Sequence, residues 1–135
     1  MTHRLFTAPA NWAEWPSQSF PKYNVYTDPE ESFFHGSDNN VEKGVTTIEL
    51  ALAGFRKKDI NVTKTNRVLT IDGKITEGDT REYLYRGIAK RDFRISFQLL
   101  SHVEVISVKM DDGMLRIKLG RVLPDEEKPK VFEIY

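Results

Sequence analysis

The sequence offers few residues whose type and spacing could support catalysis or metal binding. His3, His35 and His102 are too scattered to predict a shared metal site, and the chain of 135 residues contains no cysteine. No serine lies in a G-x-S-x-G turn, and no G-x-x-x-x-G-K-S/T loop is present to hold a nucleotide phosphate. The acidic residues are spread along the chain as solvated faces. The sequence therefore predicts no enzyme, no metal and no cofactor.

Positive and negative residues are equally numerous. Lys plus Arg and Asp plus Glu total 20 each, so the chain has no net charge to attract nucleic acid or an anionic membrane. A basic spot at Lys90, Arg91 and Arg94 is diluted by Glu82 and Asp92. Without cysteines, and without a long apolar stretch near the start of the sequence, we expect a cytoplasmic protein that binds neither nucleic acid nor membrane.

Residues 1–22 form an arm rich in large aromatic side chains and proline. The prolines and the lack of periodicity predict little regular structure beyond a short helix over residues 11–18. The aromatic side chains either pack against the rest of the chain, as scattered aromatics often do, or bind the apolar surface of unfolding proteins. These candidate client-binding residues are Phe6, Trp12, Trp15 and Phe20.

Residues 131–135 form a second apolar segment. The preceding residues, 123–130, are polar and contain two prolines, which predicts an extended linker. Phe132 and Ile134 alternate with Glu133 beyond that linker. Because the linker gives the segment a long reach, we expect the two apolar side chains to dock into a groove on a partner subunit. The alternative is an edge strand of the chain's own sheet.

Residues 23–122 carry the pattern of one all-β domain, an immunoglobulin-like β-sandwich. Short runs of β-branched and aromatic residues are separated by Gly, Asn and Asp at intervals typical of such a fold. The chain therefore divides into an N-terminal arm (1–22), a sandwich domain (23–122) and a C-terminal extension (123–135). The expected strands are residues 45–52, 59–64, 67–72, 83–85 and 93–99, and a hairpin in which 106–110 and 115–119 flank an Asp-Gly turn.

Alternation along these strands predicts which side chains face the core. The clearest case is the strand that places Phe93, Ile95, Phe97 and Leu99 on one face. Residues 83–85, by contrast, form a strand too short and isolated to pair within its own sheet, so we expect it to pair elsewhere. The other residues expected to point inward are Ile48, Leu50, Leu52, Ile60, Val62, Leu69 and Ile71.

Several short segments resemble one known family when their order and spacing are taken together. They are AGF (53–55), RDFRISFQL (91–99), DDGML (111–115) and FEI (132–134). This set resembles the alpha-crystallin domain of small heat shock proteins, and YLYRGIA (83–89) is similar to the exchange strand of the bacterial inclusion-body-binding type. The resemblance implies an ATP-independent holdase that binds unfolding proteins, forms strand-exchanged dimers and assembles into larger homo-oligomers.

The resemblance also implies which residues make each contact. The short strand of Tyr83, Leu84 and Tyr85 would cross to a partner's sheet edge near Tyr23 and Val25. The tail would add as a strand between two sheet edges, which gives affinity through backbone hydrogen bonds and specificity through alternate side-chain pockets. The implied tail anchors are Phe132 and Ile134, and the implied groove residues are Ile60, Val62, Val103, Val105, Ile106 and Val108.

Three positions depart from the family pattern. Val108 occupies the position of a small Ala in the hairpin signature. Ile95 stands where many members carry an Arg that often forms an ion pair at the dimer interface. Phe132 replaces the usual Ile of the tail, which calls for a roomier groove.

Two other functions are compatible with a β-sandwich. One is a monomeric co-chaperone that binds a larger ATP-driven chaperone, and the other is a structural assembly module. Neither accounts for the exchange-strand segment 83–89 together with the apolar tail. The mass of the intact protein in solution separates a monomer from an oligomeric chaperone.

Overall fold

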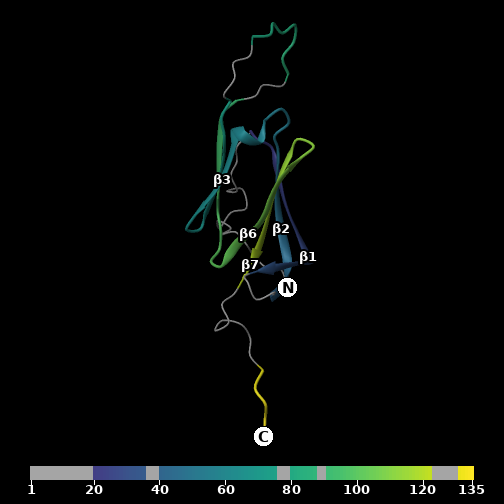
Figure 1. Cartoon of the computed structure of the whole chain (residues 1–135), viewed down its shortest axis with the longest axis vertical. Helices are drawn as coiled ribbons and strands as arrows, with labels where there is room; N and C mark the ends of the chain where they lie inside the picture. The colour runs from purple at the N-terminus through teal and green to yellow at the C-terminus, as the bar shows by residue number, and fades with distance from the viewer. Residues whose placement is uncertain (1–19, 36–39, 76–79, 88–90, 123–130) are drawn as a thin grey trace, which may run out of the picture.

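Two antiparallel sheets pack face to face in this protein (Figure 1). The computed structural model describes residues 20–35, 40–75, 80–87, 91–122 and 131–135. The predicted all-β sandwich is confirmed. Its elements are β1 (Tyr23–His35), β2 (Asn40–Ala51), the 3₁₀ turn η2 (Lys57–Asp59), β3 (Ile60–Thr65), β4 (Val68–Gly73), β5 (Phe93–Gln98), β6 (Val103–Asp111) and β7 (Met114–Arg121).

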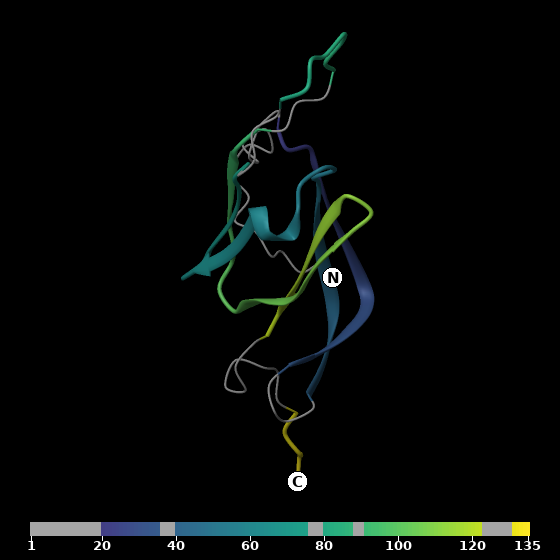
Figure 2. The same cartoon turned by 45° about the horizontal axis from the view of Figure 1, so that its top comes forward.

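One edge of each sheet, β6 in the larger and β3 in the smaller, lies next to the other. The larger sheet has the order β1-β2-β7-β6, and the smaller has the order β3-β4-β5. Among the described residues, β6 and β3 therefore each pair with a strand on one side only. Side chains of both edge strands line one groove, and β3 (teal) and β6 (green) face each other in Figure 2. An exposed edge of this kind can accept a further strand.

The core lies between the two sheets and follows the predicted alternation. In β5 the side chains of Phe93, Ile95 and Phe97 are buried, and Arg94 and Ser96 are exposed between them. Ile95 has no exposed surface. The other core residues are Ile48, Leu50, Leu52, Phe55, Leu69, Ile71, Leu99, Val103, Leu115, Ile117 and Leu119.

The predicted Asp-Gly hairpin between β6 and β7 is also confirmed. Asp112 and Gly113 form a two-residue turn between the paired residues Asp111 and Met114. Both turn residues have positive φ, at 51° and 75°, which is the backbone of a type I′ turn. Asp and Gly tolerate this conformation better than most residues, so the two residues fix the register of the hairpin.

A β-bulge in β6 interrupts the simple alternation expected there. Val105 lies opposite Leu119 and Val108 lies opposite Ile117, so one extra residue is inserted near Ile106. Cross-strand partners share a face of the sheet, and both β7 partners are fully buried. Val105 and Val108 therefore both face inward despite their odd spacing.

The β1–β2 hairpin extends beyond the rest of its sheet. Residues 32–35 of β1 pair with residues 40–43 of β2, whereas β7 pairs only with residues 46–51 of β2. The side chain of Phe33 in this extension is buried, and its ring lies directly over Gly120 of β7. A Cβ atom on Gly120 would overlap that ring, so the absence of a side chain at this position is required by packing.

Replacing Gly120 with Ala should therefore destabilise the fold. We expect Gly120→Ala to lower the free energy of unfolding by about 1–3 kcal/mol, the usual cost of overpacking. Chemical denaturation at one fixed protein concentration measures this change in the free energy of unfolding. Adding Phe33→Leu should recover part of the loss, because the smaller side chain leaves room for the new methyl group. Full stability of Gly120→Ala alone would contradict this packing.

Residues 80–87 form no strand within the single chain, so the strand expected at 83–85 is absent here. The segment lies in the long connection between β4 and β5 and projects from one end of the sandwich (Figure 1). Two guanidinium groups stack on the Tyr83 ring, Arg81 at 5.3 Å and Arg86 at 4.7 Å from its centroid. Leu84 and Tyr85 are exposed. The segment lacks a neighbouring strand to pair with in its own sandwich, as the sequence had indicated.

Candidate interaction sites

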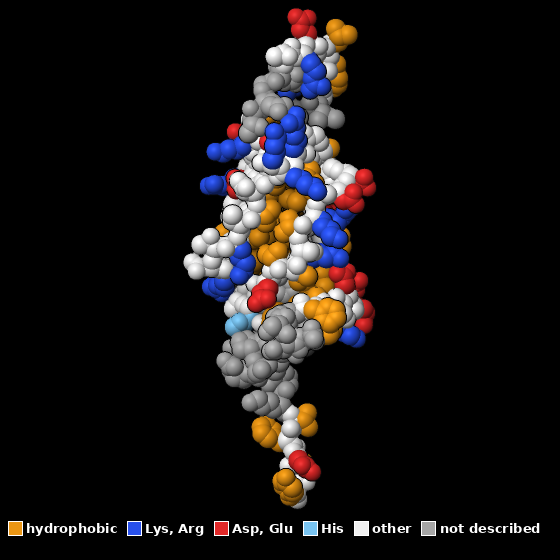
Figure 3. Space-filling model, in the orientation of Figure 1, with side chains coloured by type: hydrophobic (Ala, Val, Ile, Leu, Met, Phe, Trp, Pro, Cys, Tyr) orange, Lys and Arg blue, Asp and Glu red, His pale blue; other side chains and the backbone are white. Residues whose placement is uncertain are grey.

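A groove of about 510 Å³ opens between the adjacent edges of the two sheets. Figure 3 shows it as a hollow of apolar side chains flanked by polar and basic ones. Most of its lining is apolar, which favours an apolar ligand, and charged side chains border it. The lining residues are Lys57, Ile60, Val62, Val108, Lys109, Met110, Asp111 and Leu115.

The groove contains half of the residues expected for it. Ile60 and Val62 of β3 and Val108 of β6 line it together. Val103 is 2% exposed and belongs to the core, so it does not offer its side chain to a ligand. Val105 packs against the core and Ile106 lies at the bulge, and neither lines the groove. The bulge explains the absence of Ile106, because the inserted residue leaves the inward-facing set, whereas Val103 and Val105 face the core instead of the groove.

Several groove residues were not anticipated from the sequence. Met110 and Leu115 flank the Asp-Gly turn and count as ordinary core positions in the alternation pattern, yet both line the groove. Lys57 comes from the 3₁₀ turn η2, whose place at the groove depends on the packing of the two sheets. Only a prediction of which sheet edges lie together could have identified these residues.

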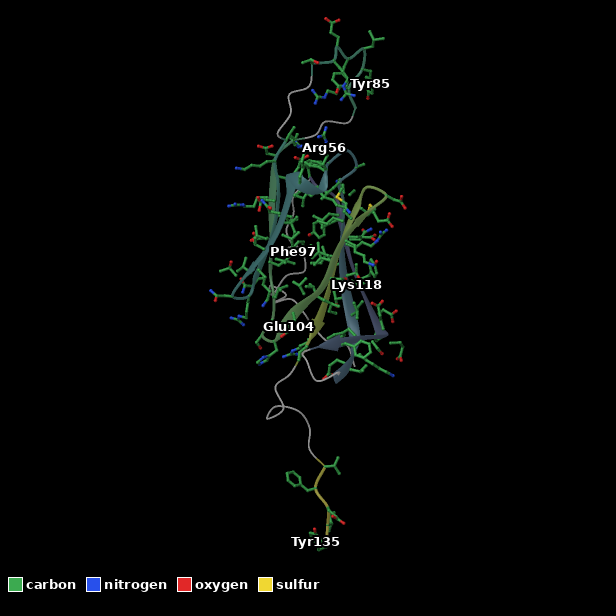
Figure 4. The ribbon with its side chains drawn as sticks, in the orientation of Figure 1. Arg56, Tyr85, Phe97, Glu104, Lys118 and Tyr135 are labelled. Atoms are coloured by element: carbon green, nitrogen blue, oxygen red, sulfur yellow. The ribbon has the colours of Figure 1, made fainter. Side chains whose placement is uncertain are left out.

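The tail extends away from the sheets, as Figure 4 shows by the position of Tyr135. Phe132 is 80% exposed and Ile134 is 95% exposed. Residues 131–135 form no strand with any of the described sheets, so the alternative of an edge strand in the chain's own sandwich is not the arrangement observed. Two large apolar side chains exposed to water indicate that the tail binds an apolar surface outside its own sandwich.

The outer edge of β1 carries two residues expected to receive an exchange strand. The Tyr23 ring packs edge-on against Phe97 with centroids 5.4 Å apart, and Val25 packs against the core. Burial raises the pKa of the Tyr23 hydroxyl. Because both side chains point inward, Tyr23 and Val25 offer only their backbone groups to an added strand.

Phe20 is not exposed in the way expected of a client-binding residue. Its ring packs against Phe93 at 5.8 Å and Phe55 at 6.3 Å between centroids, and Arg91 stacks on it at 4.9 Å. These contacts attach Phe20 to the sandwich, and its role in client binding stays a prediction. Three other expected client-binding residues lie outside the described residues, and they are Phe6, Trp12 and Trp15.

The described part of the chain shows no other candidate site. It contains no group of three or more His, Asp or Glu side chains that could hold a metal ion. None of the described residues forms a helix that is both long and apolar enough to cross a membrane.

The family match and the relatives of this chain agree on one protein family. Residues 38–135 match the Hsp20/alpha crystallin family. The small heat shock protein HspE of Bradyrhizobium diazoefficiens is 34% identical over 116 residues, which are 86% of this chain and 69% of that protein. The small heat shock protein IbpA of Serratia proteamaculans is 31% identical over 132 residues, which are 97% of this chain and 87% of that protein.

A solved structure supports the same assignment. The small heat shock protein AgsA from Salmonella typhimurium, in a C-terminally truncated form, superposes with a TM-score of 0.59 at 26% sequence identity. The match covers 84% of this chain and 98% of the other. The sequence matches and the shared fold lead to one conclusion. The chain is a small heat shock protein of the Hsp20/alpha crystallin family, whose members are ATP-independent chaperones and not enzymes.

Proposed function

We propose that this protein is a cytoplasmic holdase that binds unfolding proteins and works as dynamic oligomers built from strand-exchanged dimers. The observation that carries the proposal is the match between an apolar groove at two sheet edges and an exposed apolar tail on the same chain. Tails of other subunits occupy the grooves in the assembled state. When tails dissociate, grooves and arms become available to clients, which are held through non-directional apolar contact.

The strength of one tail contact explains why the assembly is dynamic. Burying Phe132 and Ile134 contributes about 1.5–3 kcal/mol each before the entropic cost of ordering the linker and the tail. A single contact is therefore weak. Several tails on one assembly raise the effective concentration of each, so the oligomer persists while individual contacts open and close.

The dimer forms by pairing residues 83–85 of one subunit with the outer edge of β1 in the other. Six consecutive residues of that strand, 23–28, pair regularly with β2, and their other side pairs with no described strand. Pro29 follows within the β1 bulge and has no N–H to donate, so an added strand must end there. The regular segment is long enough for a three-residue exchange strand.

Holdase activity is tested with a heated model client in the absence of ATP. We expect the intact protein to slow the aggregation of the client, measured by light scattering, and deletion of residues 1–19 to weaken that protection. This deletion keeps Phe20, whose ring contacts support the sandwich. The shortened protein should retain its dimer, because the exchange segment and β1 are intact.

Three outcomes would count against the proposal or one of its parts. Failure of the intact protein to slow aggregation at any ratio to client would contradict holdase activity. Equal protection by the shortened protein would assign client binding to the groove instead of to the arm. A monomeric mass of the intact chain would favour the co-chaperone alternative.

A further inference from the structure

A row of polar side chains crosses the outer face of the larger sheet and ends at Lys109. Asn24, Glu49, Arg116 and Lys109 are successive cross-strand partners from β1 through β2 and β7 to β6. Asn24 donates a hydrogen bond to Glu49 at 3.0 Å, and the Arg116 guanidinium lies 3.4 Å from the Glu49 carboxylate. The row therefore has one carboxylate for two adjacent cations.

Lys109 is the cation that this row leaves without a counter-charge. Its cross-strand partner is Arg116, so two positive side chains face each other on the outer surface. Among the described residues Lys109 makes no ion pair or side-chain hydrogen bond, and it is exposed. Like charges directly opposite each other on neighbouring strands are destabilising. An acidic side chain on the other flank of Lys109 would relieve this repulsion.

Strand addition at β6 would put such an acidic side chain there. Val108 and Met110 pair across the strands with the buried residues Ile117 and Leu115, whereas Lys109 pairs with Arg116 of the outer row. Lys109 therefore lies at the border of the groove, and its side chain belongs to the outer face. In a tail strand beside β6, Phe132 and Ile134 enter the groove and Glu133 points to that same outer face. Placing Glu133 opposite Lys109 aligns the two apolar anchors with Val108 and Met110, whether the tail runs parallel or antiparallel to β6.

We propose that Lys109 recognises Glu133 in the tail of a second copy of this chain, which fixes the register of the docked tail and makes the groove selective for an apolar-acidic-apolar sequence. This inference rests on the proposed docking of the tail in the groove. The apolar anchors supply the affinity, and the Lys109–Glu133 pair selects the register and the partner, because electrostatic complementarity acts mainly on specificity.

A charge exchange in the full-length chain tests the pair. Lys109→Glu and Glu133→Lys are compared singly and together, with Arg67→Glu as the control for an equal charge change at an exposed turn residue. The measurement is the protein concentration at which assemblies are half dissociated, from light scattering over a dilution series. Each single variant should raise this concentration by about fivefold, and the double variant should return it to within about twofold of the original.

The remaining outcomes separate this inference from the function on which it rests. The single effects should shrink at high salt, because the pair is at the surface. If deleting residues 131–135 dissociates the assemblies but the double variant shows no recovery, the tail docks without the Lys109–Glu133 pair and this inference is wrong. If that deletion leaves the assemblies unchanged, the docking of the tail is wrong and the inference falls with it. A fivefold effect of Arg67→Glu would mean that the effects of the single variants come from net charge. That result would also overturn the inference of a Lys109–Glu133 pair.

Discussion

Deleting residues 131–135 is expected to reduce the protein from large, heterogeneous oligomers to dimers. The segment carries the only two alternating apolar side chains of the tail, and both are at least 80% exposed in the single chain. Their docking site lies between β3 and β6, whereas the exchange segment is expected to pair with β1, at the opposite edge of the larger sheet, so dimerisation should not depend on the tail. Light scattering coupled to size-exclusion chromatography gives the mass of both forms.

Point substitutions in the tail sharpen this experiment. Phe132→Asp with Ile134→Asp should dissociate the oligomers as fully as the deletion, because charged side chains cannot be buried in an apolar groove without a large cost. Tyr135→Ser is the matched control. It removes an exposed aromatic group from the same tail but from the face that points away from the groove, so the oligomers should persist. Equal loss of assembly in both variants would mean that the alternation does not govern docking.

Introducing an arginine at Ile95 should severely destabilise this protein. Ile95 is fully buried on β5, opposite Ile71 of β4, which is also fully buried. A guanidinium at this point would have no carboxylate among the described core residues, since these are all apolar. We expect Ile95→Arg to lower the free energy of unfolding by about 3–5 kcal/mol, as measured by chemical denaturation.

Two further substitutions separate burial from a general effect of mutating this strand. Ile95→Val keeps an apolar side chain and should cost only about 0.5–1.5 kcal/mol. Ser96→Arg introduces the same charge one residue later, on the exposed face, and loses only a hydrogen bond of 3.2 Å to Thr70, at a cost of about 1 kcal/mol. If Ile95→Arg is no more harmful than Ser96→Arg, the β5 face described as core is open to solvent.

The parts of the fold that depend on short-range patterns could be predicted from the sequence. Alternation in β5 identified its buried face because successive side chains of a strand point to opposite sides. The Asp112-Gly113 turn was recognisable because few residue pairs accept positive φ at both positions. These features are set by residues that are neighbours in the chain.

The groove depends on longer-range packing and was only partly predictable. The apolar alternation changes phase between Val105 and Ile106, but the pattern alone does not show which of these side chains leave the groove. Val105, Ile106 and Val108 were therefore all expected to line it, whereas only Val108 does. Phe20 was grouped with the arm by its composition, yet it packs on Phe55 and Phe93 of the sandwich. The length of β1 was also missed, because Asp28, Pro29 and two glutamates interrupt its β-branched and aromatic residues.

Pro29 has a consequence for a protein whose partners are themselves aggregating. An unprotected sheet edge can serve as a template on which unfolded chains stack strand upon strand. The outer edge of β1 offers regular hydrogen-bonding groups only as far as Asp28, where the proline and the bulge bend the strand and remove a donor. Regular pairing on this edge can therefore extend over only six residues, and in the proposed dimer these are already paired with the exchange segment. We expect the assembled protein to offer little free edge on which the strands of a bound client could stack.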